Sequence, residues 1–326
     1  MQLILRRLVQ LVVVLLIVSF FAFCLVRILP GDPVKTIIPF GTDQQRAQLR
    51  KDLGLDKPFL TQYVDYLGNV LHGDFGHQYS TNTPVSDLIK QSLPVSLELI
   101  IYAQLIALAI AIPLGIIAAY RAGTRTDGAI NTTSFAMLAL PNFVLALLIS
   151  YFLGAQLKIL PTGGYAPGWL DPIFDSTRHM QLSDHLQFMF WPAVTLAVGQ
   201  IAIYMRLLRS DMVATLQENF ITMARAKGIP NRRILWRHAF KPSSLTLLTV
   251  AGLNIGALIG GAVVVEVIFG VPGMGQKIYQ AVVANEYVEL QSYILVFAVI
   301  FVVVNFVVDA LYAVLDPRIR RARTAA

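Results

Sequence analysis

The chain has 326 residues, of which 56% are hydrophobic and only 14% are charged. A soluble domain of this length carries about 25% charged residues, so the composition excludes an ordinary soluble protein and indicates a polytopic membrane protein. The net charge is +7, but the basic residues lie in loops and tails beside apolar segments, which is typical of membrane orientation rather than of nucleic-acid binding.

Six apolar segments are long enough to cross a bilayer as helices, so the sequence predicts an all-α membrane protein with six spans. The first segment follows Arg6 and Arg7 and is too long for a signal-peptide core, which predicts an uncleaved span whose N-terminus is cytoplasmic. The third is interrupted at Pro141-Asn142. The predicted spans are residues 8–29, 94–120, 129–157, 188–208, 245–269 and 289–315.

The polar regions between the spans predict which side of the membrane each one faces. Residues 31–93 and 158–187 are expected outside, whereas the N-terminus, two inner loops and the C-terminal tail carry 16 of the 26 Lys and Arg residues. This excess is typical of cytoplasmic segments, so both termini are expected in the cytoplasm. We therefore divide the chain into residues 1–30 with the first span, an external region 31–93, and a five-helix core 94–326.

The most informative polar stretch, residues 210–245, joins the fourth and fifth spans. Its charges exclude it from hydrocarbon, where each costs about 2.5–3.5 kcal/mol. Gly228-Ile229-Pro230 ends a first short helix, and Asn231 is expected to cap a second. This pattern favours a docking element, although a solvated basic loop is the alternative. The first helix is predicted to bear one apolar stripe at helical spacing, formed by Met212, Leu216, Phe220 and Met223.

Motifs for catalysis and metal binding are absent from the sequence. No phosphate-binding GxxxxGK[ST], zinc-binding HExxH or nucleophile GxSxG pattern occurs, and a single cysteine, Cys24, excludes an intrachain disulfide. Metal binding is therefore not expected. Four scattered histidines are expected at the external surface, namely His72, His77, His179 and His185.

Ionisable and polar residues within the spans are few. Glu98, Glu266 and Asp309 lie near span ends, where we expect interface positions rather than a proton relay. The inventory thus indicates a membrane pathway that draws its energy from a partner. Polar side chains that either line that pathway or form hydrogen bonds between helices are Asn142, Gln200, Tyr204 and Asn254.

Residues 222–249 resemble the EAA loop of ABC importer permeases, in the form found in the dipeptide and oligopeptide branch. The stretch reads TMARAKG at 222–228, and Ile234 and His238-Ala239 follow. It departs from the family pattern at Thr222, where the general form has glutamate, and at Thr246, where a proline is often found. Further landmarks of the first permease subunit occur in order: LPGDP at 29–33, LGLDKPF at 53–59, HGDFG at 72–76, LPVSLEL at 93–99, IPLGIIAA at 112–119, LPTGGY at 160–165, EVIFGVPGMG at 266–275 and LDPRIR at 315–320.

The resemblance implies a type I ABC importer permease in a prokaryotic inner membrane. Such a chain pairs with a second homologous permease subunit and with two ATPase subunits, which bind ATP and Mg, so no cofactor and no enzymatic activity are expected in this chain. An extracytoplasmic substrate-binding protein would dock on residues 31–93 and 158–187, whereas a packed cap without a partner is the alternative. The implied ATPase-docking residues are Ala224, Arg225, Ala226, Lys227, Gly228, Ile234 and His238.

The same resemblance implies short peptides as the cargo, although related machinery carries nickel, glutathione or a sugar. Two other classes of protein are weaker alternatives. A membrane-embedded enzyme needs a catalytic dyad, and none is visible in the sequence. A structural or receptor membrane protein would not need a cytoplasmic loop of two helices joined by a glycine.

Overall fold

A computed structural model describes residues 2–28, 34, 37–38, 40–52, 54–159, 164–175, 177 and 179–315. These residues form helices and no strand, apart from one isolated antiparallel bridge between His77 and Pro84. The all-α prediction is therefore confirmed for this part of the chain. The motif at 29–33, the tail from residue 316 and the side chain of Asp309 lie outside the described residues.

The chain divides into two compact units. Unit 1 comprises residues 1–96, 167–181 and 271–303, and unit 2 comprises residues 97–166, 182–270 and 304–326. Most of the regions expected outside the membrane belong to unit 1, and residues 210–245 belong to unit 2. The predicted boundaries at residues 30 and 93 stay predictions.

Unit 1 is built on helix α1 (Gln2–Ile28) and two short helices, α3 (Asp43–Asp52) and α4 (Phe59–Leu71). The ring of Phe23 stacks on that of Tyr66 at 5.6 Å, and the Tyr63 hydroxyl donates to the Leu16 carbonyl at 3.0 Å. The aromatic face of α4 thus packs on α1. Unit 1 also holds α8 (Asp171–Phe174) and α14 (Met274–Ala284). It includes residues 85–96 of α5 (Val85–Tyr120) and residues 287–303 of α15 (Tyr287–Leu315).

Unit 2 is organised around the long helix α9 (Leu182–Leu216), which contacts α6, α7, α12 and α13. Small residues allow this close packing. At Gly115 of α5, an added Cβ would lie 3.1 Å from the Met205 carbonyl oxygen of α9, which is tighter than ordinary van der Waals contact. The other helices are α6 (Arg125–Ala139), α7 (Asn142–Ile149) with the π-helical η1 (Ser150–Gln156), α12 (Phe240–Leu253) and α13 (Ile255–Phe269).

By length and composition, three described helices are able to cross a membrane: α5, α9 and residues 287–308 of α15. Two bent helix pairs raise this number to five if each pair is one span. The pair Arg125–Ala139 and Asn142–Gln156 bends by 90°, and the pair Asn231–Leu253 and Ile255–Phe269 bends by 44°. Helix α1 adds a shorter apolar segment, Val9–Cys24. The count of six spans stays a prediction.

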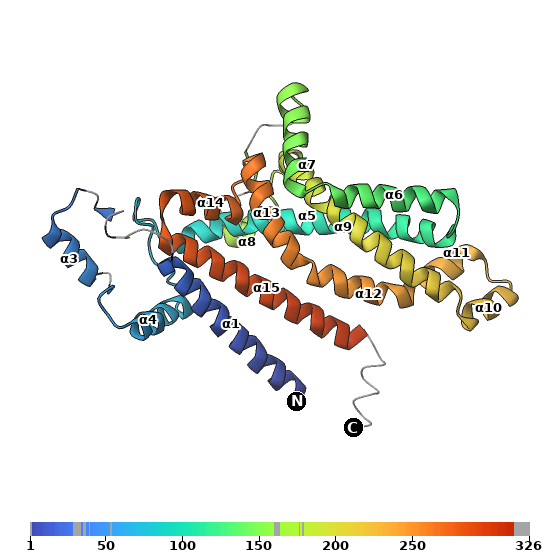
Figure 1. The fold of residues 1–326 in the computed structure, drawn as a ribbon, viewed down its shortest axis with the longest axis horizontal. Coiled ribbons are helices and arrows are strands. Elements are labelled where there is room, and N and C mark those ends of the chain that lie inside the picture. The colour runs from blue at the N-terminus through green and yellow to red at the C-terminus, as the bar shows by residue number, and fades with distance from the viewer. Residues whose placement is uncertain are drawn as a thin grey trace. The chain divides into compact units, whose positions relative to one another are not determined.

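The first break falls at the predicted position. Pro141 has no N–H to continue the helix, and Leu140 before it is extended, so α6 ends there and α7 begins at Asn142. Figure 1 shows α6 and α7 meeting at this sharp bend. The second break lies at Asn254, between α12 and α13.

An ion pair fastens α6 to α9, which lie side by side in Figure 1. Arg209 Nε and Nη2 each donate to one oxygen of the Asp127 carboxylate, both at 2.6 Å. The same carboxylate accepts from the Gly123 backbone N–H at 2.9 Å. Bidentate guanidinium–carboxylate pairs are among the strongest and most directional polar contacts in proteins.

We expect Asp127→Ala to destabilise the detergent-purified protein, because it leaves the Arg209 guanidinium without its carboxylate. The free energy of unfolding should fall by about 1–3 kcal/mol, which thermal unfolding followed by intrinsic fluorescence will detect as a lower midpoint. Asp56→Ala, at an exposed turn residue, is the matched control. Equal midpoints for the two variants would show that the ion pair does not stabilise unit 2.

Candidate functional site

Residues 210–245 form a bent helical connection at one end of α9 (Figure 1). Helix α9 runs on to Leu216, after which come α10 (Asn219–Ala226), α11 (Asn231–Arg233) and the π-helical η2 (Ile234–Ala239). Gly228 makes the bend with a φ of +71°, which disfavours residues bearing a Cβ. An added Cβ would meet nothing within 4 Å in this chain, so conformation rather than space requires glycine there.

The inner face of this connection is buried against the helices of unit 2. Ile221, Ala224 and Ile234 belong to the same apolar cluster as Met212 of α9 and Leu247 of α12. Their side chains are fully or almost fully removed from solvent. This close packing joins α10 and η2 to α9 and α12.

The predicted apolar stripe is wrong. Met212 and Leu216 belong to α9, while Phe220 and Met223 of α10 are 42% and 60% exposed. The turn at residues 217–218 interrupts the helix and resets its rotation, so the spacing of four does not carry across it. Asn231 is the first residue of α11 rather than its cap, which is Pro230, and its side-chain amide donates to the Tyr120 hydroxyl at 3.3 Å.

The seven predicted docking residues divide between the two faces. Ala224 and Ile234 point inward, and His238 is half-buried. The remaining four are exposed: Arg225, Ala226, Lys227 and Gly228. The docking role of the seven residues stays a prediction.

The outer face carries exposed apolar side chains among basic ones, namely Phe220, Met223 and Trp236. Of these, the sequence reasoning missed Trp236. A shallow cavity of ≈ 450 Å³ is lined by Pro230, Arg232, Arg233, Trp236 and Arg237. The available signal was a tryptophan between basic residues, in a stretch that the sequence predicts to lie outside the bilayer.

A polar cluster joins three helices within the spans. The Tyr204 hydroxyl of α9 donates to Gln104 Oε1 of α5 at 3.1 Å, and Gln104 Nε2 donates to the Ala251 carbonyl of α12 at 3.5 Å. Tyr204 is fully buried, so of its two readings the structure favours hydrogen bonding between helices. Gln104 was missed, although a glutamine in an apolar run was the signal.

The other candidate path residues have different surroundings. Asn142 stands at the start of α7, and its side chain lies 3.6 Å from where a Cβ would be on both Gly199 of α9 and Gly261 of α13. Gln200 Oε1 and Asn254 Nδ2 are buried and have no hydrogen-bond partner among the described residues. These two unpaired atoms keep Gln200 and Asn254 as candidates for a polar pathway.

Three residues predicted at surfaces or interfaces are fully buried. Glu98 and Glu266 are 0% exposed, and so is His185. The sequence reasoning placed them by distance from span ends and could not show that distant segments cover them. His185 Nδ1 lies 2.7 Å from the Ala166 carbonyl oxygen, and Nε2 lies 3.2 Å from Glu98 Oε2. In the described part of the chain, no three His, Cys, Asp or Glu residues are grouped to hold a metal ion.

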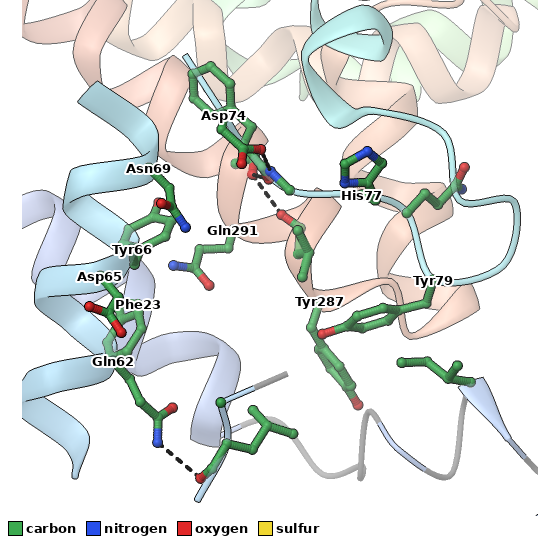
Figure 2. Close-up of a pocket in the computed structure, with 18 of the residues that line it drawn as sticks. Phe23, Gln62, Asp65, Tyr66, Asn69, Asp74, His77, Tyr79, Tyr287 and Gln291 are labelled. Carbon is green, nitrogen blue, oxygen red and sulfur yellow. Dashed lines mark hydrogen bonds between the residues drawn. The ribbon is translucent and has the colours of Figure 1, made fainter. Parts of the chain in front are cut away.

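Unit 1 contains a cavity of ≈ 1120 Å³. Figure 2 shows Tyr66 and Asn69 of α4 on one side of it, Gln291 of α15 in the middle, and His77 and Tyr79 on the other side. The backbone N–H groups of Tyr79 and Ser80 donate to the Glu286 carboxylate at 2.6 and 2.8 Å. Burial, with the Glu286 charge as a further cause, raises the pKa of the Tyr79 phenol to about 12, so it stays neutral at physiological pH.

Comparison with known proteins decides the family. A family model described as the inner membrane component of binding-protein-dependent transport systems matches residues 111–321, and a model of its N-terminal part matches residues 1–100. The chain belongs to this family. It is a membrane protein and a permease subunit of an ABC transporter, the component that is not itself the ATPase.

Relatives match over nearly the full length. A probable peptide ABC transporter permease of Sinorhizobium fredii is 33% identical over 97% of this chain and 98% of its own. An oligopeptide transport system permease of Bacillus subtilis is 35% identical over the same shares. A di/tripeptide transport system permease of Pseudomonas aeruginosa is 33% identical over 98% of each chain.

The fold also matches a solved structure. A chain of the MetNI methionine ABC transporter, in inward-facing conformations, aligns with a TM-score of 0.56 and 14% identity, and the match covers 70% of this chain and 96% of that one. At this identity the likeness shows a shared fold, so the prediction of an ABC importer permease fold is confirmed.

We expect Tyr204→Phe to lower the thermal midpoint of the purified protein by a few degrees, because it removes the hydroxyl bonded to Gln104 at a cost of about 1 kcal/mol. The half-saturating cargo concentration for uptake should stay unchanged. Tyr279→Phe, at an exposed tyrosine, is the control. An unchanged midpoint with weaker uptake would instead place Tyr204 in the pathway.

Proposed function

We propose that this chain forms half of the translocation path of an ATP-driven importer of short peptides and docks an ATPase subunit through residues 210–245. The observation that carries the proposal is the two-sided connection between α9 and α12. Its inner face is anchored by Ile221, Ala224 and Ile234, and its outer face presents apolar side chains among cations.

Docking through the outer face is a helix-in-groove contact. Phe220 and Met223 offer apolar anchors on α10, and Trp236 offers another on η2. The exposed Arg225 and Lys227 favour a groove rimmed by acidic residues. Because the inner face is packed on α9 and α12, displacement of the ATPase surface moves these helices as well.

The complete importer, in this proposal, contains a second homologous permease subunit, two ATPase subunits that bind ATP and Mg, and an extracytoplasmic binding protein. The chain lies in a prokaryotic inner membrane, with both termini in the cytoplasm. The binding protein docks on residues 31–93 and 158–187, and residues of the first of these regions line most of the unit 1 cavity. In this proposal the chain binds no cofactor of its own and no nucleic acid. The surface that contacts no protein partner faces membrane lipid.

Coupling in this assembly is reciprocal. If docking of the loaded binding protein favours closure of the ATPase dimer, ATP binding must favour cargo release. The two equilibrium constants change by the same factor. A rigid-body movement carried by α9 and α12 fits that requirement, since packed helices move as units.

Short peptides are the cargo because relatives named as peptide, oligopeptide and di/tripeptide permeases match over nearly the whole chain. Nickel, glutathione and a sugar stay as the alternative cargoes of the same machinery. Titrating the cognate binding protein with di- to pentapeptides, and separately with each alternative, distinguishes them. Tight binding of an alternative with no binding of peptides would contradict the peptide assignment.

We expect Gly228→Asp to reduce co-purification of the ATPase subunits at least tenfold with little change in the yield of membrane-inserted permease. The residue would be strained at positive φ and would add an anion to the cationic outer face. Gly123→Asp is a matched control, because Gly123 also has a positive φ, of +79°, and open space around it. Co-purification of Gly228→Asp at wild-type yield would refute docking at this bend.

A further inference from the structure

A buried polar network in unit 2 connects α5, α9 and residues Tyr165 and Ala166. The imidazole of His185, at the start of α9, contacts the Glu98 carboxylate of α5, and the Tyr165 hydroxyl donates to the same Oε2 at 3.2 Å. The imidazole also lies beside two aromatic rings, Tyr102 at 5.6 Å and Tyr165 at 5.4 Å between centroids. Glu98 and His185 are both completely removed from solvent.

Two side chains hold the segment Gly164–Ala166. A backbone carbonyl only accepts hydrogen bonds, so His185 Nδ1, at 2.7 Å from the Ala166 oxygen, carries a hydrogen and donates it. His185 Nε2 lies 3.2 Å from Glu98 Oε2, within ion-pair distance but without the geometry of a hydrogen bond. Glu98 of α5 thus holds the Tyr165 hydroxyl, and His185 of α9 holds the Ala166 carbonyl.

The network also has a distinctive place along the chain. The chain enters unit 2 at Leu97, leaves it after Ala166, enters again at Leu182, leaves after Gly270 and enters a last time at Val304. Glu98, Ala166 and His185 each lie within three residues of one of these entry or exit points. At the exit after Gly270, the Gly164 N–H donates to the Gly270 carbonyl oxygen at 3.5 Å. These contacts inside unit 2 thus connect residues at four of the five points.

We propose that Glu98 and His185 are positioning residues for transport: they clamp the segment Gly164–Ala166 onto α5 and α9. The clamp fixes the points from which the chain continues into residues 167–181, part of the region assigned to the binding protein. This inference rests on the proposed function for its transport role, whereas the clamp itself is a property of this chain alone.

The clamp and ordinary stabilisation predict different behaviour for an apolar replacement. Replacing a buried ion pair by apolar groups of similar volume is often neutral or stabilising. Glu98→Met with His185→Leu should therefore keep the thermal midpoint near that of the wild type. It cannot hold the Ala166 carbonyl or the Tyr165 hydroxyl, so it should release the segment.

The first readout is amide hydrogen exchange of the purified permease. In the double variant, we expect exchange at Tyr165 and Ala166 to rise at least tenfold, while α12 stays protected. Glu98→Gln should preserve protection, because its side-chain oxygen can still accept from the Tyr165 hydroxyl and His185 Nδ1 still donates to the Ala166 carbonyl. His179→Leu, at an exposed histidine of the same external region, is the control. Unchanged exchange in the double variant would overturn the clamp.

The second readout uses the complete importer in nanodiscs, with ATPase activity measured against binding-protein concentration. The double variant should need at least tenfold more binding protein for half-maximal stimulation, and Glu98→Gln should stay within about threefold of wild type. Wild-type stimulation by the double variant would overturn the positioning role. If the wild-type complex itself shows no stimulation, the proposed function fails, and the exchange result still decides whether the clamp exists.

Discussion

The burial of one face of the connection between α9 and α12 is the constraint on which the proposed transport mechanism depends. Ile221, Ala224 and Ile234 occupy the same apolar cluster as residues of α9 and α12. Protein interiors are close-packed, so a displaced connection cannot slide without moving the helices beneath it. Docking residues on the opposite, exposed face would then act on the translocation path through α9 and α12, without touching the path themselves.

Interruptions of the helices are placed where neighbouring helices cover them. The break at Pro141 puts Asn142 against glycines of α9 and α13, and the break at Asn254 lies next to the cluster of Gln104 and Tyr204. Backbone groups freed within a bilayer must find partners inside the protein. Tyr204 and Gln104 therefore serve helix packing, whereas Gln200 Oε1 and Asn254 Nδ2 are buried without a hydrogen-bond partner among the described residues.

Local chemistry made some features predictable from the sequence. Proline ended α6 at residue 141, and glycine marked the bend at 228, because each acts on its own backbone. The turn after Leu216 interrupts the helix, so the predicted stripe of Met212, Leu216, Phe220 and Met223 does not form. The burial of Glu98 and His185 depends on residues far along the chain, and no local pattern reports it.

Single-cysteine accessibility tests the two-faced connection most directly. In a Cys24→Ser background, which removes the only native cysteine, Met223→Cys and Ile221→Cys are labelled with a small thiol reagent, with and without the ATPase subunits. The account predicts that position 223 reacts rapidly in the permease alone and at least tenfold more slowly in the complex, while position 221 is protected in both. Equal reactivity of position 223 with and without the ATPase would contradict it.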